Sequence, residues 1–185
     1  MGAGIIGLGA LQCIKSRSSA KTVVVDLSDK RLAMATKLGA DLTINAREKD
    51  VVLEMMGSGH LGLDGALAGN VDAVYDCAGI AKSFEGTSVL EQALAMVKQD
   101  GKVIIVAVFE KPPQIEWNLV VRKGIQLFGS WAWTPEELVE ASRLISSGTI
   151  DRKPLITHTF PLEEASTAYE TQLQAEEAIK VVLTP

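Results

Sequence analysis

Side chains that bind metals or form cross-links are scarce in this sequence. The 185 residues include only two cysteines and two histidines, namely Cys13, Cys77, His60 and His158. They show no CxxC motif and no Cys/His spacing of the kind that builds a zinc site. We therefore expect no metal site and no disulfide framework, and we expect both thiols to be reduced and buried in a cytoplasmic protein.

Long apolar runs and an excess of positive charge are also missing. No segment is long enough to span a bilayer, and the first residues do not resemble a secretion signal. The formal net charge of −5 argues against a surface that follows nucleic-acid phosphates. The sequence thus predicts a protein without membrane or nucleic-acid partners.

Short apolar runs alternate regularly with helical patterns. Predicted strands cover residues 21–26, 42–45, 72–79, 102–108 and 125–130. Predicted helices cover residues 8–16, 29–38, 48–56, 88–97 and about 134–147, the last with Thr134 as N-cap and Pro135 at the first helical position. Because parallel neighbours need long crossovers, this alternation predicts an α/β fold with a Rossmann-like, doubly wound parallel sheet.

The pattern changes from Lys153 onward. A short extended piece, a helix beginning near Leu162 and a final strand at residues 178–185 are predicted there. We expect residues 1–152 to form one α/β domain and residues 153–185 to form a separate C-terminal segment.

A glycine-rich loop opens the chain. GAGIIGLG contains GxGxxG at Gly2, Gly4 and Gly7, with Ile5 and Ile6 between them. In such a loop the first glycine permits a tight turn, the second lets the backbone approach a pyrophosphate, and the third lets the helix pack closely on the sheet. Alone the motif is weak, because glycine-rich turns are common.

An acidic residue follows the loop at the expected interval. Asp26 ends the strand after the loop, about 20 residues on, where a carboxylate can accept both hydroxyls of the adenosine ribose. Its charge would oppose a 2′-phosphate, so NAD is favoured over NADP. Arg31, one turn into the next helix, could lie over the adenine or could be a solvated helix-face arginine.

With these features the sequence resembles the medium-chain dehydrogenase/reductase family, of the zinc-dependent alcohol and polyol dehydrogenase type. The resemblance covers nearly the whole chain and rests on GAGIIGLGALQ, VVVDLSDKRLAMATKLGAD, DAVYDCAG, GKVIIVAV, LFGSWAW and PLITHTFPLEEASTAYE. It implies that residues 1–152 are the cofactor-binding domain and that residues 153–185 return to the catalytic domain.

The resemblance also implies further cofactor contacts. Cys77 and Ala78 should line the adenosine and ribose path, and the backbone of Val106, Ser130 and Ala132 should hold the nicotinamide carboxamide. Lys180 falls where the family often places a basic residue against the pyrophosphate, and the alternative is a solvated edge-strand lysine.

The family's zinc ligands lie in an N-terminal catalytic domain whose motifs are absent here. We therefore assign no catalytic residue and no metal ligand, and His60 and His158 receive no role. The loop also directly follows Met1, so the first strand of the sheet is expected to be lacking. Truncation is favoured as the reason, and a strand supplied by a partner chain is the alternative.

These features predict the NAD-binding part of a zinc-assisted alcohol or polyol dehydrogenase, nearest the sorbitol, butanediol and threonine dehydrogenases, with an alcohol or polyol substrate in the full-length protein. The chain alone is expected to be inactive. The alternatives are a non-catalytic dinucleotide-binding or interaction module and, less favoured because of Asp26, a zinc-independent quinone-reductase-like protein.

A homodimer is also predicted. In the family the cofactor domains pair edge to edge, and the apolar strand between Ile125 and Ser130 is the expected edge. The neighbouring Trp131 and Trp133 fit this interface, but they could instead pack against the catalytic domain. Residues 157–162 and 181–183 are expected to expose apolar surface or to refold against the sheet.

Overall fold

The computed structural model describes residues 1–56, 69–78, 88–174 and 176–185. The chain divides into two compact units, one made of residues 1–2 and 46–131 and the other of residues 3–45 and 132–185. Each is described by itself. Among the described residues, no helix combines the length and the apolar character that a membrane crossing requires.

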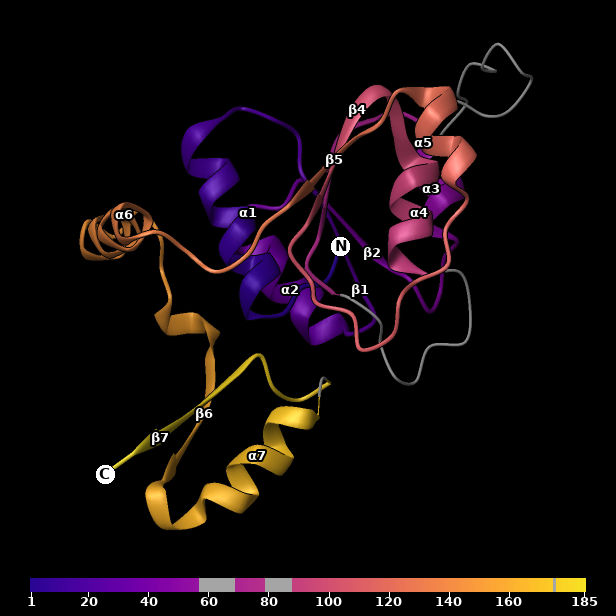
Figure 1. Ribbon diagram of the computed structural model, residues 1–185. Coiled ribbons are helices and arrows are strands. Elements are labelled where there is room, and N and C mark those ends of the chain that lie inside the picture. The colour runs from indigo at the N-terminus through magenta and orange to yellow at the C-terminus, as the bar shows by residue number, and fades with distance from the viewer. Residues whose placement is uncertain (57–68, 79–87, 175) are drawn as a thin grey trace. The chain divides into compact units, whose positions relative to one another are not determined.

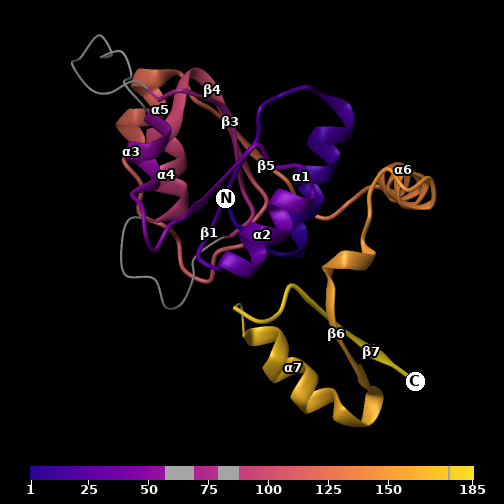
Figure 2. The ribbon, with the colours of Figure 1, turned by 180° about the vertical axis from the view of Figure 1, so that it is seen from behind.

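The unit that contains residues 46–131 is built on a parallel three-stranded sheet. Its elements are α3 (Val51–Met56), β3 (Val71–Asp76), α4 (Val89–Met96), β4 (Val97–Ile105), α5 (Trp117–Lys123) and β5 (Gln126–Gly129). The strand order is β3-β4-β5, and the register aligns Val74 with Val103 and Val103 with Leu127. Helices α4 and α5 lie on the same side of this sheet (Figures 1 and 2).

Apolar residues at alternate strand positions and along the helices form the core of this unit. The buried members are Val74, Leu90, Ala93, Leu94, Val97, Val103 and Ile125. Burying a side chain of this size contributes roughly 1.5–3 kcal/mol, so this cluster is what fixes α4 on the sheet. The predicted strands at 72–79, 102–108 and 125–130 are confirmed in existence and direction, with ends that shift by one to five residues.

The start of β4 differs from the prediction. We expected α4 to run to Val97 and the strand to begin at Lys102, yet α4 ends at Met96 and Val97 already pairs with Val71. Val97 is fully buried, and its contact with the core explains why the chain turns into a strand there. Residues 98–101 then form an irregularity in which Asp100 has a φ of 57°.

Helix α5 was not predicted. The Glu116 side chain accepts a hydrogen bond from the Asn118 N–H at its start, and Gly124 ends it in the left-handed conformation at φ 60°. The Lys123 ammonium donates to the carbonyls of Leu94, Ala95 and Val97 at 2.9, 2.7 and 3.0 Å. A cation bonded to the last carbonyls of α4 satisfies groups that the helix itself cannot, and it ties α5 to α4.

The second unit contains two separate pairs of parallel strands. Its elements are α1 (Ile5–Arg17), β1 (Val23–Asp26), α2 (Asp29–Lys37), β2 (Leu42–Asn45), α6 (Pro135–Ser146), β6 (Ile156–Pro161), α7 (Ala165–Leu173) and β7 (Lys180–Thr184), with 3-10 turns at Lys153–Leu155 and Leu162–Glu164. Strand β1 pairs with β2, and β6 pairs with β7. All strand pairs of the described chain are parallel, so the predicted α/β fold with parallel strands is confirmed.

Helix ends in this unit follow the local sequence signals. Ser28 caps α2, and Gly39, at φ 93°, lies just beyond its end. Thr134 and Glu137 form a capping box at the start of α6, with Pro135 at the first helical position as predicted. Side-chain caps of this kind are each worth about 1 kcal/mol, so they define where the helices begin.

Helix α1 is held on its neighbours by apolar contacts and by one reciprocal polar pair. The buried cluster around it consists of Ala3, Leu8, Leu11, Val24, Leu32, Ala35, Leu155 and Ile179. The Gln12 side chain is 7% exposed; it donates to the Asp151 carbonyl at 3.0 Å and accepts from the Asp151 N–H at 2.7 Å. This pair fixes the connection between α6 and β6 to the middle of α1.

A charged cluster joins α1, β1 and β2 at one end. Asp41 Oδ2 accepts hydrogen bonds from the Thr22 N–H at 2.7 Å, the Thr22 hydroxyl at 2.9 Å and the Lys15 ammonium at 3.0 Å. The backbone hydrogen bond from Thr22, followed by those from Lys15 and the Thr22 hydroxyl, lowers the pKa of Asp41 from 3.8 to about 2.

The depressed pKa of Asp41 predicts a contribution to stability that depends on pH. Because the carboxylate is favoured in the folded state, the contribution is present above about pH 3.8 and is lost as the pH falls through about 2. We expect Asp41→Asn to lose less stability than the wild type between pH 5 and pH 2, as measured by urea midpoints at each pH. Glu163→Gln is the control for removing one carboxylate elsewhere; an equal loss in wild type and Asp41→Asn would contradict the prediction.

Candidate functional site

The glycine loop begins with a residue that only glycine suits. Gly2 has a φ of 84°, and a Cβ built on it would lie 2.9 Å from both the Cβ and the backbone nitrogen of Ala78. Met1 next to it pairs with β3, since its ammonium donates to the Tyr75 carbonyl and its carbonyl accepts from the Cys77 N–H, both at 2.9 Å. The positive φ of Gly2 suits glycine alone, and Met1 and Gly2 lie against the end of β3.

Helix α1 begins earlier than predicted, at Ile5 instead of Leu8, so Ile5, Ile6 and Gly7 form its first turn. Gly4 is its N-cap, with φ −73° and ψ −174°, and it provides no side-chain cap. The first turn also contains no acidic residue. The amino end of a 13-residue helix therefore presents N–H groups that the helix cannot satisfy, which favours an anion.

Space for such an anion exists above Gly4. Among the described residues, a Cβ at this position would meet only the Arg31 Nη1 atom, at 4.0 Å. The backbone conformation of Gly4 does not require glycine. The missing side chain is therefore significant because it leaves room for a ligand to approach the loop. The predicted role of Gly7 in helix packing stays a prediction.

Asp26 lies at the carboxyl end of β1 and is bonded to the loop. Its Oδ2 accepts from the Ala3 N–H at 2.6 Å, and its Oδ1 accepts from the N–H groups of Leu27 at 2.8 Å and Ser28 at 2.9 Å. A carboxylate has about four acceptor positions. Three are used here, so one position on Oδ2 is left for a hydroxyl donor.

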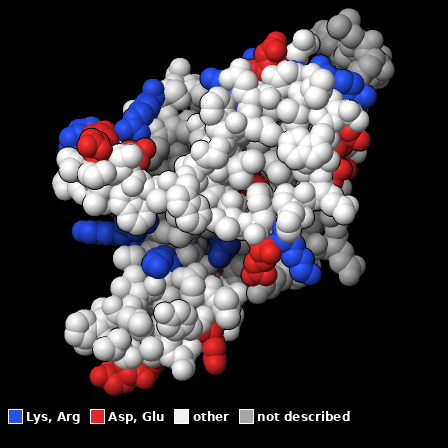
Figure 3. Space-filling model, in the orientation of Figure 1, with Lys and Arg blue, Asp and Glu red and all other residues white. Residues whose placement is uncertain are grey.

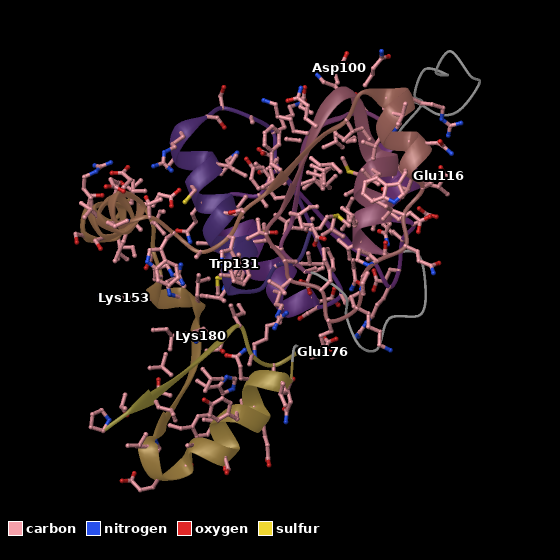
Figure 4. The ribbon with its side chains drawn as sticks, in the orientation of Figure 1. Asp100, Glu116, Trp131, Lys153, Glu176 and Lys180 are labelled. Carbon is pink, nitrogen blue, oxygen red and sulfur yellow. The ribbon has the colours of Figure 1, made fainter. Side chains whose placement is uncertain are left out.

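Arg31 lies between the glycine loop and the C-terminal segment. Its Nη2 donates to the Ala178 carbonyl at 2.8 Å, whereas its Nε is buried and has no hydrogen-bond partner within the described residues. Within this unit the structure thus brings Gly4, Asp26 and Arg31 to the start of α1. Lys180 is exposed at the beginning of β7, two residues beyond Ala178 (Figure 4).

In the other unit, predicted site residues follow the carboxyl ends of β3, β4 and β5. Cys77 and Ala78 come directly after β3, and burial raises the pKa of the Cys77 thiol. The Val106 N–H donates to the Asp76 carbonyl and the Ser130 N–H donates to the Ile105 carbonyl, both at 2.9 Å. The N–H groups of Val106 and Ser130 are therefore already hydrogen-bonded to the neighbouring strands. The carbonyl groups of these two residues are what a ligand could bind.

Asp76 was missed by the sequence analysis. Its side chain is fully buried, its Oδ1 accepts from the Ala78 N–H at 3.0 Å, and its carbonyl accepts from the N–H groups of Val106 and Ala107. The residue connects the chain after β3 with the chain after β4. An acid at the end of an apolar strand resembles Asp26 in the sequence, and that repetition was the available signal.

Ala132 was predicted as a backbone contact, and it has a φ of 54°, which is unusual for a residue other than glycine. Such strain is found at functional sites but also in tight turns. The neighbouring Trp131, in the other unit, is 82% exposed.

No group of three His, Cys, Asp or Glu side chains in the described parts of the chain could hold a metal ion. His158 is partly buried, shares a hydrogen bond of 3.0 Å with the Thr157 hydroxyl and stacks on Phe160 with ring centroids 6.3 Å apart. His60 lies outside the described residues.

A parallel α/β fold with a glycine-rich loop leading into a helix and an acid at the end of the next strand is the arrangement of a dinucleotide-binding domain. The family model described as zinc-binding dehydrogenase matches residues 6–147. This chain therefore belongs to the zinc-binding dehydrogenase family.

Relatives and solved structures agree with this assignment. The chain is 32% identical over 184 residues to a sorbitol dehydrogenase of Arabidopsis thaliana, covering 98% of this chain and 48% of the relative. It matches the structure of a short chain alcohol dehydrogenase from Escherichia coli CFT073 complexed with NADH, with a TM-score of 0.82 and 25% identity over 100% of this chain and 50% of that one. It also matches a zinc-binding dehydrogenase from Sinorhizobium meliloti bound to NADP, with a TM-score of 0.80 and 25% identity over 100% of this chain and 51% of that one.

The chain spans about half the length of the curated relatives that it matches. It corresponds to the cofactor-binding region of zinc-type alcohol and polyol dehydrogenases, whose solved structures include complexes with NADH and with NADP.

Proposed function

We propose that this chain binds NAD as the cofactor-binding part of an alcohol or polyol dehydrogenase. The observation that carries the proposal is the 2.6 Å hydrogen bond from the Ala3 N–H to Asp26 Oδ2. This bond holds Asp26, which we expect to bind the ribose hydroxyls, against the glycine loop, which we expect to bind the phosphates. An acid that only caps a helix or faces solvent does not require a hydrogen bond from this loop.

The pyrophosphate would be bound at the start of α1. The N–H groups of Ile5, Ile6 and Gly7 point out of the amino end of the helix, and Gly4 leaves the backbone uncovered. The Arg31 guanidinium, whose Nη1 lies beside Gly4, would add positive charge. Lys180 is proposed as a further cation for the phosphates.

The adenosine ribose would be bound by Asp26. Its remaining acceptor position on Oδ2 can take one ribose hydroxyl, and the second hydroxyl can share an oxygen that already accepts from Leu27 or Ser28. A 2′-phosphate would face this charge, which is why we propose NAD over NADP, although a structural relative was solved with NADP.

The nicotinamide end would be held by backbone groups. With their N–H groups occupied, Val106 and Ser130 offer carbonyls to a carboxamide NH₂, and Ala132 offers an N–H to its oxygen. Cys77 and Ala78, against which Gly2 packs, would line the path of the adenosine ribose. When bound, the nicotinamide ring accepts a hydride from the substrate alcohol or donates one to its ketone.

The proposed sheet is doubly wound, with the strand that precedes the glycine loop beside β3. Met1 supports this order, because it exchanges hydrogen bonds with Tyr75 and Cys77 in the way that a residue of a parallel neighbour would.

Substrate chemistry in the whole protein is proposed from the family. The sorbitol dehydrogenase relative favours an alcohol or polyol, and we place no zinc ligand in this chain. We further propose that residues 153–185 belong to the catalytic domain. Their exposed apolar side chains are Ile156, Leu162, Tyr169 and Leu173, and the visible face over β6, β7 and α7 is largely uncharged (Figure 3).

Titration of the folded chain with NADH tests the proposal. The chain contains three tryptophans, Trp117, Trp131 and Trp133, whose emission overlaps the absorption of NADH. We therefore expect saturable quenching of tryptophan emission together with a rise in NADH emission. A folded sample without saturable binding would contradict NAD binding. If the chain binds NADH but the full-length protein shows no dehydrogenase activity, the result would favour the alternative of a non-catalytic dinucleotide-binding module.

A homodimer through the outer edge of β5 is the accompanying prediction. Strand β5 pairs with β4, and no other described strand pairs with its second edge. Phe128 on this strand is 45% exposed and Trp131 is 82% exposed. We expect light scattering to give twice the chain mass for the wild type and a lower mass for Phe128→Lys; a monomeric wild type would end the dimer proposal.

A further inference from the structure

The amino end of α2 holds the turn that leads into β7. The Lys30 ammonium donates to the Glu177 carbonyl at 2.7 Å and to its carboxylate at 3.3 Å. The Arg31 Nη2 donates to the Ala178 carbonyl at 2.8 Å. Figure 4 shows the two ends of this turn, with Glu176 near the end of α7 and Lys180 at the start of β7.

The two contacts differ in their surroundings. Lys30 and Glu177 form an exposed pair, with 47% and 63% of their side chains accessible, so water competes for it. The bond from Arg31 to Ala178 is partly buried, and the guanidinium is planar and always charged. The Arg31 bond is therefore the stronger of the two links to the turn.

Arg31 also has a donor on the side of the glycine loop. Its Nη1 is the atom nearest to the Cβ position of Gly4. Its buried Nε lacks a hydrogen-bond partner in the described residues, so the bond to Ala178 does not satisfy the guanidinium fully. The unsatisfied N–H groups at the start of α1 favour an anion at the same place.

We propose that Arg31 couples dinucleotide binding to the turn at residues 176–178. A phosphate oxygen bonded to Nη1 fixes the plane of the guanidinium, and this fixed plane holds Nη2 against the Ala178 carbonyl. The inference rests on the proposed function of the glycine loop. Because coupling is reciprocal, the closed turn must in return strengthen dinucleotide binding.

Amide hydrogen exchange at the turn measures the coupling. The Ala178 N–H bonds to the Gln174 carbonyl, the Ile179 N–H to the Thr157 hydroxyl and the Val181 N–H to the Gln172 side chain, so these amides exchange slowly only when the turn is closed. Saturating NADH should slow their exchange by about 10-fold, within the 5–150-fold range of typical couplings. Adenosine, which has no phosphate, should not slow it.

Two variants separate coupling from simple stabilisation. Arg31→Lys keeps the charge but cannot bond to a phosphate and to Ala178 in one plane, so NADH should still bind, more weakly, without slowing exchange at the turn. Lys30→Met removes the exposed link to the same turn, so the turn should open more often while NADH still slows its exchange by the wild-type factor.

The outcomes distinguish this inference from the proposed function. Saturable NADH binding to the wild type without slower exchange at the turn overturns the coupling alone. The same holds if Arg31→Lys retains the full effect of NADH. Failure of NADH to bind the folded wild type overturns both the proposed function and the coupling.

Discussion

Gly2→Ala should destabilise the protein by about 3 kcal/mol, because two costs add at this position. A left-handed backbone costs an alanine roughly 1–2 kcal/mol, and forcing a methyl group into a filled space costs roughly 1–3 kcal/mol. The new Cβ would lie 2.9 Å from the backbone nitrogen of Ala78, and a backbone atom cannot move aside as a flexible side chain can. Urea unfolding followed by circular dichroism measures the change.

Gly4→Ala is the matched control, because the same substitution two residues later meets no obstacle. At φ −73° an alanine is unstrained, and among the described residues its Cβ would meet only the Arg31 Nη1 at 4.0 Å, an ordinary van der Waals contact. We expect its stability to fall by no more than about 1 kcal/mol, since alanine is a poorer N-cap residue than glycine. Its affinity for NADH should fall, because the methyl group occupies the approach to the loop. Equal stability of Gly2→Ala and Gly4→Ala would contradict the account of the loop.

Asp26→Asn should remove most of the preference for NADH over NADPH. Two unit charges about 4 Å apart interact by roughly 4 kcal/mol at an effective dielectric constant of ~20, and salt reduces this. We therefore expect the wild type to bind NADH roughly 100-fold more tightly than NADPH, and we expect that ratio to fall at least about 10-fold in Asp26→Asn. Competitive fluorescence titrations of the two reduced cofactors measure the ratio.

The hydrogen bonds of Asp26 predict a second effect of Asp26→Asn, on the affinity for NADH itself. An asparagine can present one oxygen to the N–H groups of Leu27 and Ser28, but its NH₂ group would then face the Ala3 N–H, which needs an acceptor. NADH affinity should therefore fall as well. Asp29→Asn is the control, since it also removes one carboxylate charge, three residues after Asp26. In the described structure the Asp29 side chain accepts a hydrogen bond only from Asn45. An unchanged cofactor ratio in Asp26→Asn would refute the proposed role of the carboxylate.

Strands and capped helices could be predicted because their signals are local. The β-branched run before Asp26 gives β1, and Thr134, Pro135 and Glu137 define the start of α6 by hydrogen bonds within a few residues. That Gly2 occupies a position suited to glycine was predictable for the same reason, since GxGxxG constrains the backbone directly.

The features that were missed depend on contacts between distant residues. Helix α5 is tied to α4 by the bonds of Lys123 to three carbonyls, and β4 begins at Val97 because this side chain fills the core between β3 and α4. Neither contact has a periodic signature in the sequence.

The candidate site shows the same division. The spacing from Gly7 to Asp26 could be predicted, but the bond from Arg31 to Ala178 joins residues 147 positions apart. Similarly, Asp76 is recognisable as a link between the ends of β3 and β4 only once its bonds to Ala78, Val106 and Ala107 are seen.

Amide chemical shifts of the isotopically labelled chain, titrated with NADH, test the central claim most directly because they locate the bound dinucleotide. We predict saturable shifts that are largest at residues 3–8 and 26–28, with further shifts at Cys77 and Ala78, and much smaller shifts at α6. Saturable binding with its largest shifts at α6 or α7 and none at residues 3–8 would contradict the assignment of the glycine loop as the dinucleotide site.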